Sequence, residues 1–191
     1  MNFVPQALPD ILVFEPKVHG DKRGYFVETF RQDIVECSTG YKINFVQDNE
    51  SRSDKGVLRG LHFQLPPHAQ SKLVRVIEGA VLDVAVDIRR GSPSFGQYVA
   101  VELSSINKKQ MFIPRGFAHG YVVLTESATL VYKVDNYYSP KCDRGLAFDD
   151  IDLNIDWQLN KQELLLSNKD SQQPRLSELT DFFEYDYNYY E

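Results

Sequence analysis

Short runs in which apolar and polar residues alternate fill most of the chain. Gly56, Pro66-Pro67, Gly79 and Gly91-Ser92-Pro93 separate several of these runs. A period of two is the pattern of β-strands with one buried face, and many such runs at regular spacing are typical of a sandwich or barrel. We therefore predict an all-β fold whose strands lie within residues 11–18, 43–51, 57–65, 72–79, 80–88, 97–104, 110–116, 118–125 and 128–139.

Helical segments are expected only at the periphery. We predict a short helix over residues 31–40 that ends at Gly40. We predict short helical or irregular segments at residues 160–170 and 175–184. No internal repeat or low-complexity linker divides the chain, so residues 1–191 predict one domain. The acidic and aromatic residues 181–191 form a tail that either docks on a partner subunit or stays mobile, and the sequence does not decide between the two.

Two strands of this pattern carry titratable residues. Strict alternation places His62 on the face opposite Arg59, and Lys72 on the face of Val74 and Val76. Near the mouth of a barrel, such faces can line a polar pocket with an apolar floor. A lone histidine is more often a core residue and a lone lysine a solvated edge residue, so the hypothesis of a site depends on the whole cluster. Its further candidates are Arg115, His119, Tyr132, Tyr137, Tyr138, Lys169 and Asp170.

Composition and charge narrow the class of protein. Hydrophobic residues make up 42% and charged residues 25%, which is enough apolar material for a core. There is no long apolar run and no basic-then-apolar leader, so we expect no membrane span. Cys37 and Cys142 are too few for a disulfide framework, which favours the reducing cytoplasm. The net charge of −6 argues against nucleic-acid binding but is compatible with a small anionic ligand held by a local basic cluster.

The histidine spacing argues against a metal centre. Small barrels of this kind often bind iron or manganese through a His-x-His pair, and the four histidines, His19, His62, His68 and His119, contain no such pair. His68 lies in a proline-rich turn and His19 in a polar loop. There is also no glycine-rich phosphate loop and no Gly-x-Ser-x-Gly elbow. A scattered site of three histidines is possible in principle, but we expect no metal, and no motif indicates a cofactor.

Ordered motifs connect the chain with a known family. Between about Phe14 and about Leu179, the chain resembles the dTDP-4-dehydrorhamnose 3,5-epimerases, cupin-fold enzymes of deoxysugar biosynthesis. The resemblance implies a cupin-type jelly-roll β-barrel with short peripheral helices. The motifs are DKRGYFVETF, FVQDNESRS, GVLRGLHFQ, QSKLVRVIEGAVLDVAVDIRRGSPSFGQY, FIPRGFAHGYVVL, VYKVDNYYSP, DRG and LSNKD.

The resemblance implies four catalytic residues. His62 corresponds to the general base and Asp170 to the carboxylate that pairs with it. Lys72 corresponds to the residue that stabilises charge on the keto oxygen of the sugar, and Tyr132 to the proton donor on the opposite face of the ring. The chemistry suits these residue types, because a 4-keto group acidifies the hydrogens on carbons 3 and 5 and a histidine can remove them near neutral pH.

The resemblance also implies a set of substrate-binding residues. Three of them, in the segment that reaches the neighbouring subunit in the family, correspond to nucleotide-binding positions, and Tyr138 corresponds to an aromatic ring against the base. The implied assembly is a homodimer. The full set of binding residues is Arg23, Phe26, Glu28, Gln47, Asn49, Arg59, His119, Tyr138, Asp143 and Lys169.

The expected function is metal-independent 3,5-epimerisation of a nucleotide-linked 4-keto-6-deoxy sugar. One alternative is a single-centre epimerase or ketoisomerase on a GDP- or CDP-linked sugar, because relatives differ in carrier and in the number of centres inverted. A non-catalytic sugar-nucleotide binding barrel is a second alternative. The chain departs from the family pattern after Arg144-Gly145, where Leu146 to Asp150 replace the usual tryptophan-containing stretch, and in the tail from Asp181.

Overall fold

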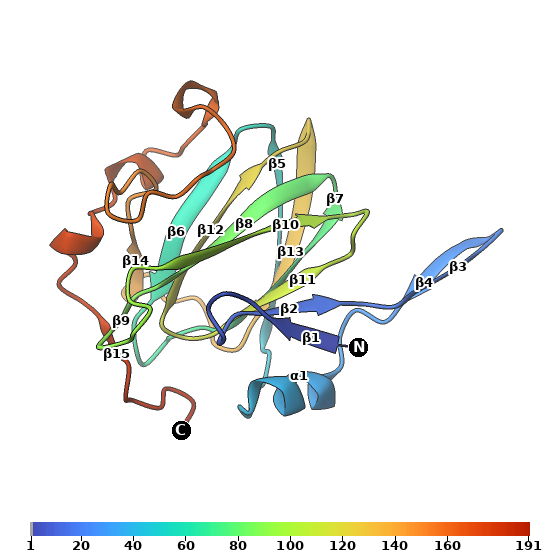
Figure 1. The fold of residues 1–191 in the computed structure, drawn as a ribbon, viewed down its shortest axis with the longest axis horizontal. Coiled ribbons are helices and arrows are strands. Elements are labelled where there is room, and N and C mark those ends of the chain that lie inside the picture. The colour runs from blue at the N-terminus through green and yellow to red at the C-terminus, as the bar shows by residue number, and fades with distance from the viewer. Residues whose placement is uncertain (1) are drawn as a thin grey trace.

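Two antiparallel sheets packed face to face form the body of the protein, which the computed structural model describes for residues 2–191 (Figure 1). The six-stranded sheet has the order β1 (Asn2–Pro5), β2 (Leu12–Glu15), β11 (Gln110–Ile113), β7 (Lys72–Glu78), β13 (Ser127–Val134) and β5 (Gln47–Asp54). The five-stranded sheet has the order β10 (Tyr98–Ser104), β8 (Ala80–Asp87), β12 (Phe117–Val123), β6 (Leu58–Gln64) and β14 (Asp143–Gly145).

The smaller elements lie around this body. This arrangement confirms the prediction of a jelly roll with short peripheral helices. Helix α1 (Gln32–Thr39) ends at Gly40, whose φ of 73° gives the left-handed conformation that a glycine tolerates. The remaining elements are the hairpin β3 (Val18–Asp21) and β4 (Gly24–Val27), the pair β9 (Arg89–Arg90) and β15 (Phe183–Glu184), and the short helices η1 (Lys161–Glu163), η2 (Asp170–Gln172) and η3 (Leu176–Glu178).

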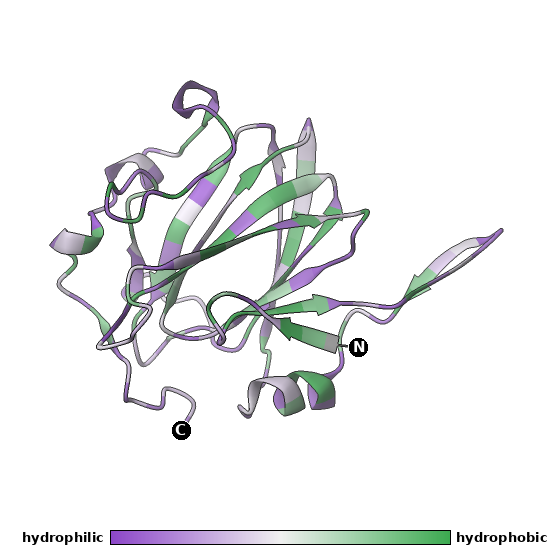
Figure 2. Ribbon diagram, viewed as in Figure 1, coloured by the Kyte–Doolittle hydropathy of each residue, from purple (hydrophilic) through white to green (hydrophobic). Residues whose placement is uncertain are grey.

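The principal core lies between the two sheets. Val74, Val76 and Leu130 come from the six-stranded sheet, and Val81 and Leu103 from the five-stranded sheet. All five side chains are almost completely removed from water, which is the dominant stabilising contribution to such a fold. Figure 2 shows the same arrangement, with hydrophobic stretches on the central strands and hydrophilic stretches in the hairpin tip and the peripheral loops.

A second core covers the outer face of the five-stranded sheet. Leu82 and Val84 of β8 pack there with Trp157, Leu176 and Phe183 from the C-terminal part of the chain. The segments after β14 therefore form a layer over that sheet instead of a separate unit (Figure 1). This layer also carries η2, and so it brings residues near position 170 against strand β6.

A register shift in β6 corrects the predicted placement of Arg59. His62 lies opposite His119 of β12, but Arg59 lies opposite Tyr121, so two residues of β6, Gly60 and Leu61, lie opposite the single Gly120 of β12. Because of this bulge, Arg59 and His62 lie on the same face of β6, turned toward the six-stranded sheet, where strict alternation predicted opposite faces; Arg59 itself stays exposed. The Arg59 Nε atom donates a hydrogen bond of 3.1 Å to Ser53 Oγ on the facing strand β5.

The bulge depends on a glycine. Gly60 has a φ of +126°, a conformation that L-residues with a side chain rarely adopt. A Cβ atom at this position would lie 2.5 Å from the Cα atom of Gly120 and 2.8 Å from the carbonyl oxygen of His119. The close approach of β6 and β12 leaves no space for any other residue.

The β3–β4 hairpin projects away from the body (Figure 1). Tyr25 and Phe26 on this hairpin are 61% and 69% exposed, which is unusual for large aromatic side chains. Across residues 2–191, no helix is long and apolar enough to cross a membrane.

We expect Gly60→Ala to lower the free energy of unfolding by at least about 2 kcal/mol, because the substitution combines backbone strain with a backbone clash. Urea denaturation of the two proteins measures this difference. The matched control is Gly20→Ala in the exposed hairpin, where the nearest atom to a new Cβ is 3.7 Å away. Equal effects of the two substitutions would contradict the requirement for glycine in β6.

Candidate active site

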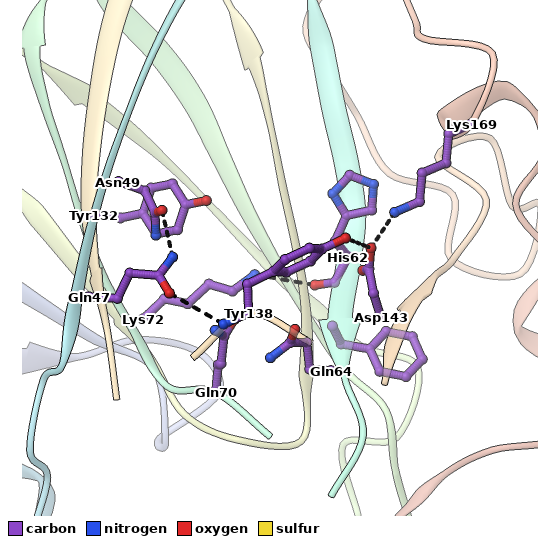
Figure 3. A pocket seen from close by; sticks show the side chains of 11 residues that line it. Gln47, Asn49, His62, Gln64, Gln70, Lys72, Tyr132, Tyr138, Asp143 and Lys169 are labelled. Carbon is purple, nitrogen blue, oxygen red and sulfur yellow. Dashed lines mark hydrogen bonds and ion pairs between the residues drawn. The ribbon is translucent and has the colours of Figure 1, made fainter. Parts of the chain in front are cut away.

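A pocket of about 400 Å³ opens between the two sheets at the ends of β5, β6, β7 and β13 (Figure 3). Its walls are mainly polar, although the interior on which it rests is apolar. Pockets of this type, with a few polar groups converging above a hydrophobic floor, are typical of ligand sites. The lining residues are Gln47, Asn49, His62, Phe63, Gln64, Gln70, Lys72, Tyr132, Tyr138, Asp143 and Lys169.

The strand register explains why these side chains converge. In the six-stranded sheet, Tyr132 lies opposite Asn49 on one side and Val74 on the other, so Tyr132 and Lys72 share the inward face. In the five-stranded sheet, His62 faces the same interior from the opposite direction. Tyr132 and His62 therefore lie on opposite sides of the pocket (Figure 3).

His62 and Asp170 form a closely coupled pair. The His62 Nε2 atom lies 2.6 Å from Asp170 Oδ1, and the Ser167 hydroxyl donates a 2.9 Å hydrogen bond to Asp170 Oδ2. Burial raises the pKa of Asp170, but the hydrogen bonds from His62 and Ser167 and the charge of Lys169 outweigh it, so the pKa lies below its usual value. Asp170 thus stays ionised at neutral pH and holds an imidazole that is 31% exposed toward the pocket.

Lys72 places an ammonium group on the pocket floor. Its Nζ atom lies 3.4 Å from the carbonyl oxygen of His62, and the residue is only 9% exposed. Burial lowers the pKa of Lys72 to about 8, against the opposing effect of the Asp83 and Asp143 carboxylates. A cation held in such a dry position interacts strongly with any negative charge that develops on a bound ligand.

Tyr132 carries a proton that it retains at neutral pH. Burial raises the pKa of its phenol, and the hydroxyl of Tyr121 acts in the same direction, whereas Arg59 acts against both. The neutral phenol faces the pocket from β13. It can therefore act as a hydrogen-bond donor or as a proton donor to a ligand between it and His62.

Three further predicted residues meet at the mouth of the pocket. Asp143 accepts a 3.0 Å hydrogen bond from the Tyr138 hydroxyl and forms an ion pair with Lys169 at 2.5 Å (Figure 3). Tyr138 is 57% exposed, so its ring is available to a planar group. Gln47 donates a 2.8 Å hydrogen bond to Asn49 and accepts one of 3.3 Å from the backbone of Tyr138.

The other predicted binding residues do not line this pocket. Arg59 is exposed and hydrogen-bonded to Ser53 of β5, and His119 is buried, with its Nε2 atom 2.8 Å from Asp83 Oδ1. Arg23, Phe26 and Glu28 lie on or directly after the projecting hairpin, away from the pocket of their own chain (Figure 1).

Sequence reasoning missed several polar residues of the site. Gln64 shares the His62 face of β6 and lines the pocket, and the alternation could have identified it. Gln70, in the loop before β7, gave no periodic signal. Asp83 is completely buried behind Lys72 and His119, and its Oδ2 atom has no hydrogen-bond partner among the described residues. Within the same part of the chain, no group of three His, Cys, Asp or Glu side chains is arranged to hold a metal ion.

Comparison with known proteins identifies the family of the chain. A family model described as dTDP-4-dehydrorhamnose 3,5-epimerase matches residues 5–178. The chain belongs to the dTDP-4-dehydrorhamnose 3,5-epimerase family. It is 55% identical over 170 residues to the dTDP-4-dehydrorhamnose 3,5-epimerase of Shigella flexneri, covering 89% of this chain and 93% of the relative.

Solved structures of this family of isomerases superpose closely on the chain. A dTDP-6-deoxy-D-glucose-3,5-epimerase from Legionella pneumophila, in complex with dTDP-4-keto-L-rhamnose, is 46% identical, with a TM-score of 0.92 and coverage of 97% of this chain and 99% of that one. A dTDP-4-dehydrorhamnose 3,5-epimerase from Bacillus anthracis, with TDP and pyrophosphate bound, is 40% identical, with a TM-score of 0.86 and coverage of 91% and 98%.

The buried ammonium of Lys72 predicts a pH-dependent stability. The folded lysine loses its proton near pH 8, whereas the unfolded lysine keeps it until about 10.5, so the unfolded state binds more protons between these values. The free energy of unfolding of the wild type therefore gains a contribution that grows as the pH rises through this window. Lys72→Met removes the free-energy cost of burying the ammonium. We expect this variant to be more stable than the wild type by about 3 kcal/mol at pH 7, and the difference in free energy of unfolding should shrink toward pH 10.5.

Urea denaturation at several pH values measures this gap. Lys55→Met, at an exposed lysine, is the control and should leave the pH dependence of the wild type unchanged. A gap between wild type and Lys72→Met that stays constant from pH 7 to pH 10.5 would show that the Lys72 ammonium is not destabilised by burial.

Proposed function

We propose that the protein inverts the configuration at carbons 3 and 5 of a dTDP-linked 4-keto-6-deoxy sugar without a metal or cofactor. The observation that carries the proposal is the placement of the His62–Asp170 pair and the Tyr132 phenol on opposite sides of one pocket, above the ammonium of Lys72. An epimerase needs this arrangement, because a proton must leave one face of the sugar ring and another must arrive at the opposite face.

His62 is the proposed general base. Asp170 accepts a hydrogen bond at one ring nitrogen, which fixes the tautomer and leaves the other nitrogen to accept a proton from the sugar. When the imidazole becomes positively charged, the ionised Asp170 stabilises it. The Ser167 hydroxyl holds this carboxylate in place by a hydrogen bond to Asp170 Oδ2.

Lys72 is the proposed stabiliser of the intermediate. Removal of a proton beside the keto group moves negative charge to the oxygen at carbon 4. An ammonium already fixed in a dry pocket stabilises that charge without reorganisation at the moment of reaction. The buried position of Lys72 between the sheets supports this role.

Tyr132 is the proposed proton donor. The enolate formed by His62 is planar, so protonation from the His62 side restores the original configuration and protonation from the Tyr132 side inverts it. The raised pKa of Tyr132 supports this role, since the phenol is neutral and holds a proton to give. Solvent then returns the proton to the phenolate.

The remaining predicted residues are proposed to hold the carrier. Gln47, Asn49 and Lys169 line the pocket beside the catalytic groups, and the exposed ring of Tyr138 can stack on a base. The exposed Arg59 and the buried His119 are proposed to contact the phosphates or the sugar. A deoxythymidine carrier is supported by the dTDP-sugar and TDP complexes of the two similar structures, and a two-centre reaction by the names of the relatives.

A single-centre reaction is the alternative with a specific observation in its favour. A 3′-monoepimerase from Streptomyces bikiniensis in complex with dTDP-quinovose is 34% identical to this chain, with a TM-score of 0.85. The fold alone therefore does not separate the two outcomes. The higher identity to 3,5-epimerases supports inversion at two centres.

Proton NMR in heavy water tests the proposal with dTDP-4-keto-6-deoxyglucose as substrate. The wild type is expected to introduce deuterium at carbons 3 and 5 and to release the doubly inverted product. GDP- and CDP-linked sugars, run separately, identify the carrier. Deuterium at one carbon would indicate a single-centre enzyme, and no uptake with any carrier would leave only a binding protein.

Tyr132→Phe separates the two proton transfers. His62 still removes the proton from carbon 3, exchanges it with heavy water and returns a deuteron to the same face, so deuterium enters without inversion, and formation of the inverted product falls by about 100-fold or more. The same NMR spectra measure both quantities. His62→Asn is the matched control, because it should abolish exchange and inversion together. Equal loss of exchange and inversion in Tyr132→Phe would contradict the assignment of the donor.

We further propose that the protein acts as a cytoplasmic homodimer in which the β3–β4 hairpin completes the pocket of the partner subunit. The hairpin projects from the body, its aromatic residues are exposed, and Arg23, Phe26 and Glu28 lie away from the pocket of their own chain. Arginine suits the diphosphate of a sugar nucleotide, because its planar group matches phosphate oxygens.

A heterodimer of two damaged chains tests this arrangement. Arg23→Ala and His62→Asn homodimers should both be strongly impaired. A purified heterodimer that contains one chain of each kind should recover roughly half of the wild-type activity, because one of its two pockets has an intact His62 and receives an intact hairpin. No recovery would mean that the hairpin serves its own chain, and a monomeric mass in solution with full activity would exclude the dimer.

A further inference from the structure

The C-terminal tail, residues 181–191, packs on the body of its own chain. Strand β15 pairs with β9, and Phe183 is 1% exposed. The Phe183 ring lies edge-on to Phe63 at 6.3 Å between centroids, and Phe63 follows His62 in β6. This tail lies beyond residue 178, where the match to the family model ends.

Tyr190 anchors the end of the tail. Its ring stacks on Tyr41 at 4.0 Å between centroids and 14° between planes, and the Arg115 guanidinium lies 5.0 Å from the ring centre. Its hydroxyl lies 2.7 Å from Ser71 Oγ and accepts a 3.1 Å hydrogen bond from the backbone N–H of Arg115. The phenol therefore combines an apolar contact with two polar ones.

A closed network joins Tyr190 to the start of β7. The Ser71 backbone N–H donates a 2.6 Å hydrogen bond to Asp135 Oδ1, and Arg115 pairs with Asp135 Oδ2 at 3.1 Å. Arg115 also donates to the carbonyl oxygen of Tyr189. Ser71 is completely buried and the Asp135 side chain is 2% exposed, so loss of one member leaves its partners without water as a substitute.

Ser71 lies directly between two residues of the pocket, Gln70 and Lys72. Ser71 directly precedes strand β7, which begins at Lys72. The Ser71 hydroxyl contacts the tail, while the Lys72 ammonium extends into the pocket. A displacement of the Ser71 backbone displaces Lys72 by a similar distance.

We propose that Tyr190 is a positioning residue of the epimerase, whose hydroxyl fixes Ser71 and thereby holds the Lys72 ammonium where charge develops on the sugar. The inference rests on the catalytic role of Lys72 proposed above. Lys72 has a long and flexible side chain, and a displacement of 1 Å at a catalytic group can reduce the rate by about 100-fold. The tail restrains the one strand end from which this side chain starts.

Tyr190→Phe tests the role of the hydroxyl, because it keeps the stacking on Tyr41 and removes only the polar contacts. We expect the kcat of epimerisation to fall by about tenfold, with the KM for the dTDP sugar within about twofold of the wild-type value. Ser71→Ala removes the other side of the same hydrogen bond and should give a similar loss. The double variant should be no slower than either single variant.

Tyr187→Phe is the matched control in the same tail, since Tyr187 is 65% exposed, and its kcat should equal that of the wild type. A kcat of Tyr190→Phe equal to this control would overturn the proposal. A lower melting temperature with unchanged kcat at 25 °C would also overturn it, because the hydroxyl would then only stabilise the fold. Additive losses in the double variant would do the same.

A second measurement does not depend on activity. Lysine amines carrying ¹³C-methyl groups report their surroundings by NMR, and the Lys72 signal is assigned from its absence in Lys72→Met. We expect Tyr190→Phe to shift this signal and Tyr187→Phe to leave it unchanged. If the wild type catalyses no exchange, the proposed function fails, and an unshifted Lys72 signal would then separately reject the positioning role.

Discussion

The burial of two apolar sheet faces against each other is the constraint on which the site depends. Residues such as Val74, Leu130 and Leu103 hold the sheets together at a fixed separation. Strands β7 and β13, which supply Val74 and Leu130, continue into the pocket, where Tyr132 of β13 faces His62 of β6. In the proposed mechanism, a planar sugar intermediate between them has one face toward the base His62 and the other toward the acid Tyr132. The packing of the core therefore determines that His62 and Tyr132 lie on opposite sides of the pocket.

The apolar environment changes the pKa values of the titratable groups in the pocket. Burial lowers the pKa of Lys72 to about 8, raises that of Tyr132, and would raise that of Asp170 if His62 and Ser167 did not offset it. Each group consequently keeps the protonation state that its proposed role requires at neutral pH. The cost to folding is greatest for Lys72, whose counter-charges Asp83 and Asp143 only partly compensate its desolvation.

The central strands, helix α1 and the position of Lys72 on the face of Val74 and Val76 could be predicted from the sequence because they follow local periodicity. The placement of Arg59 could not, since one glycine inserts a residue into β6 and reverses the faces before it. Periodicity also says nothing of contacts between distant segments. The pairing of His62 with Asp170 was available only through the motif resemblance, and the contacts of Tyr190 with Ser71 carried no local signal at all.

The pairing of His62 with Asp170 joins residues 108 positions apart in the chain. Contacts of such long range form late and slowly in folding, because the entropy of closing a large loop must be overcome first. The pocket is thus complete only in a fully folded chain. A ligand that requires this pair binds the native state and not its precursors, and its binding energy adds to native stability by mass action. Binding of such a ligand is therefore expected to raise the resistance of the protein to proteolysis.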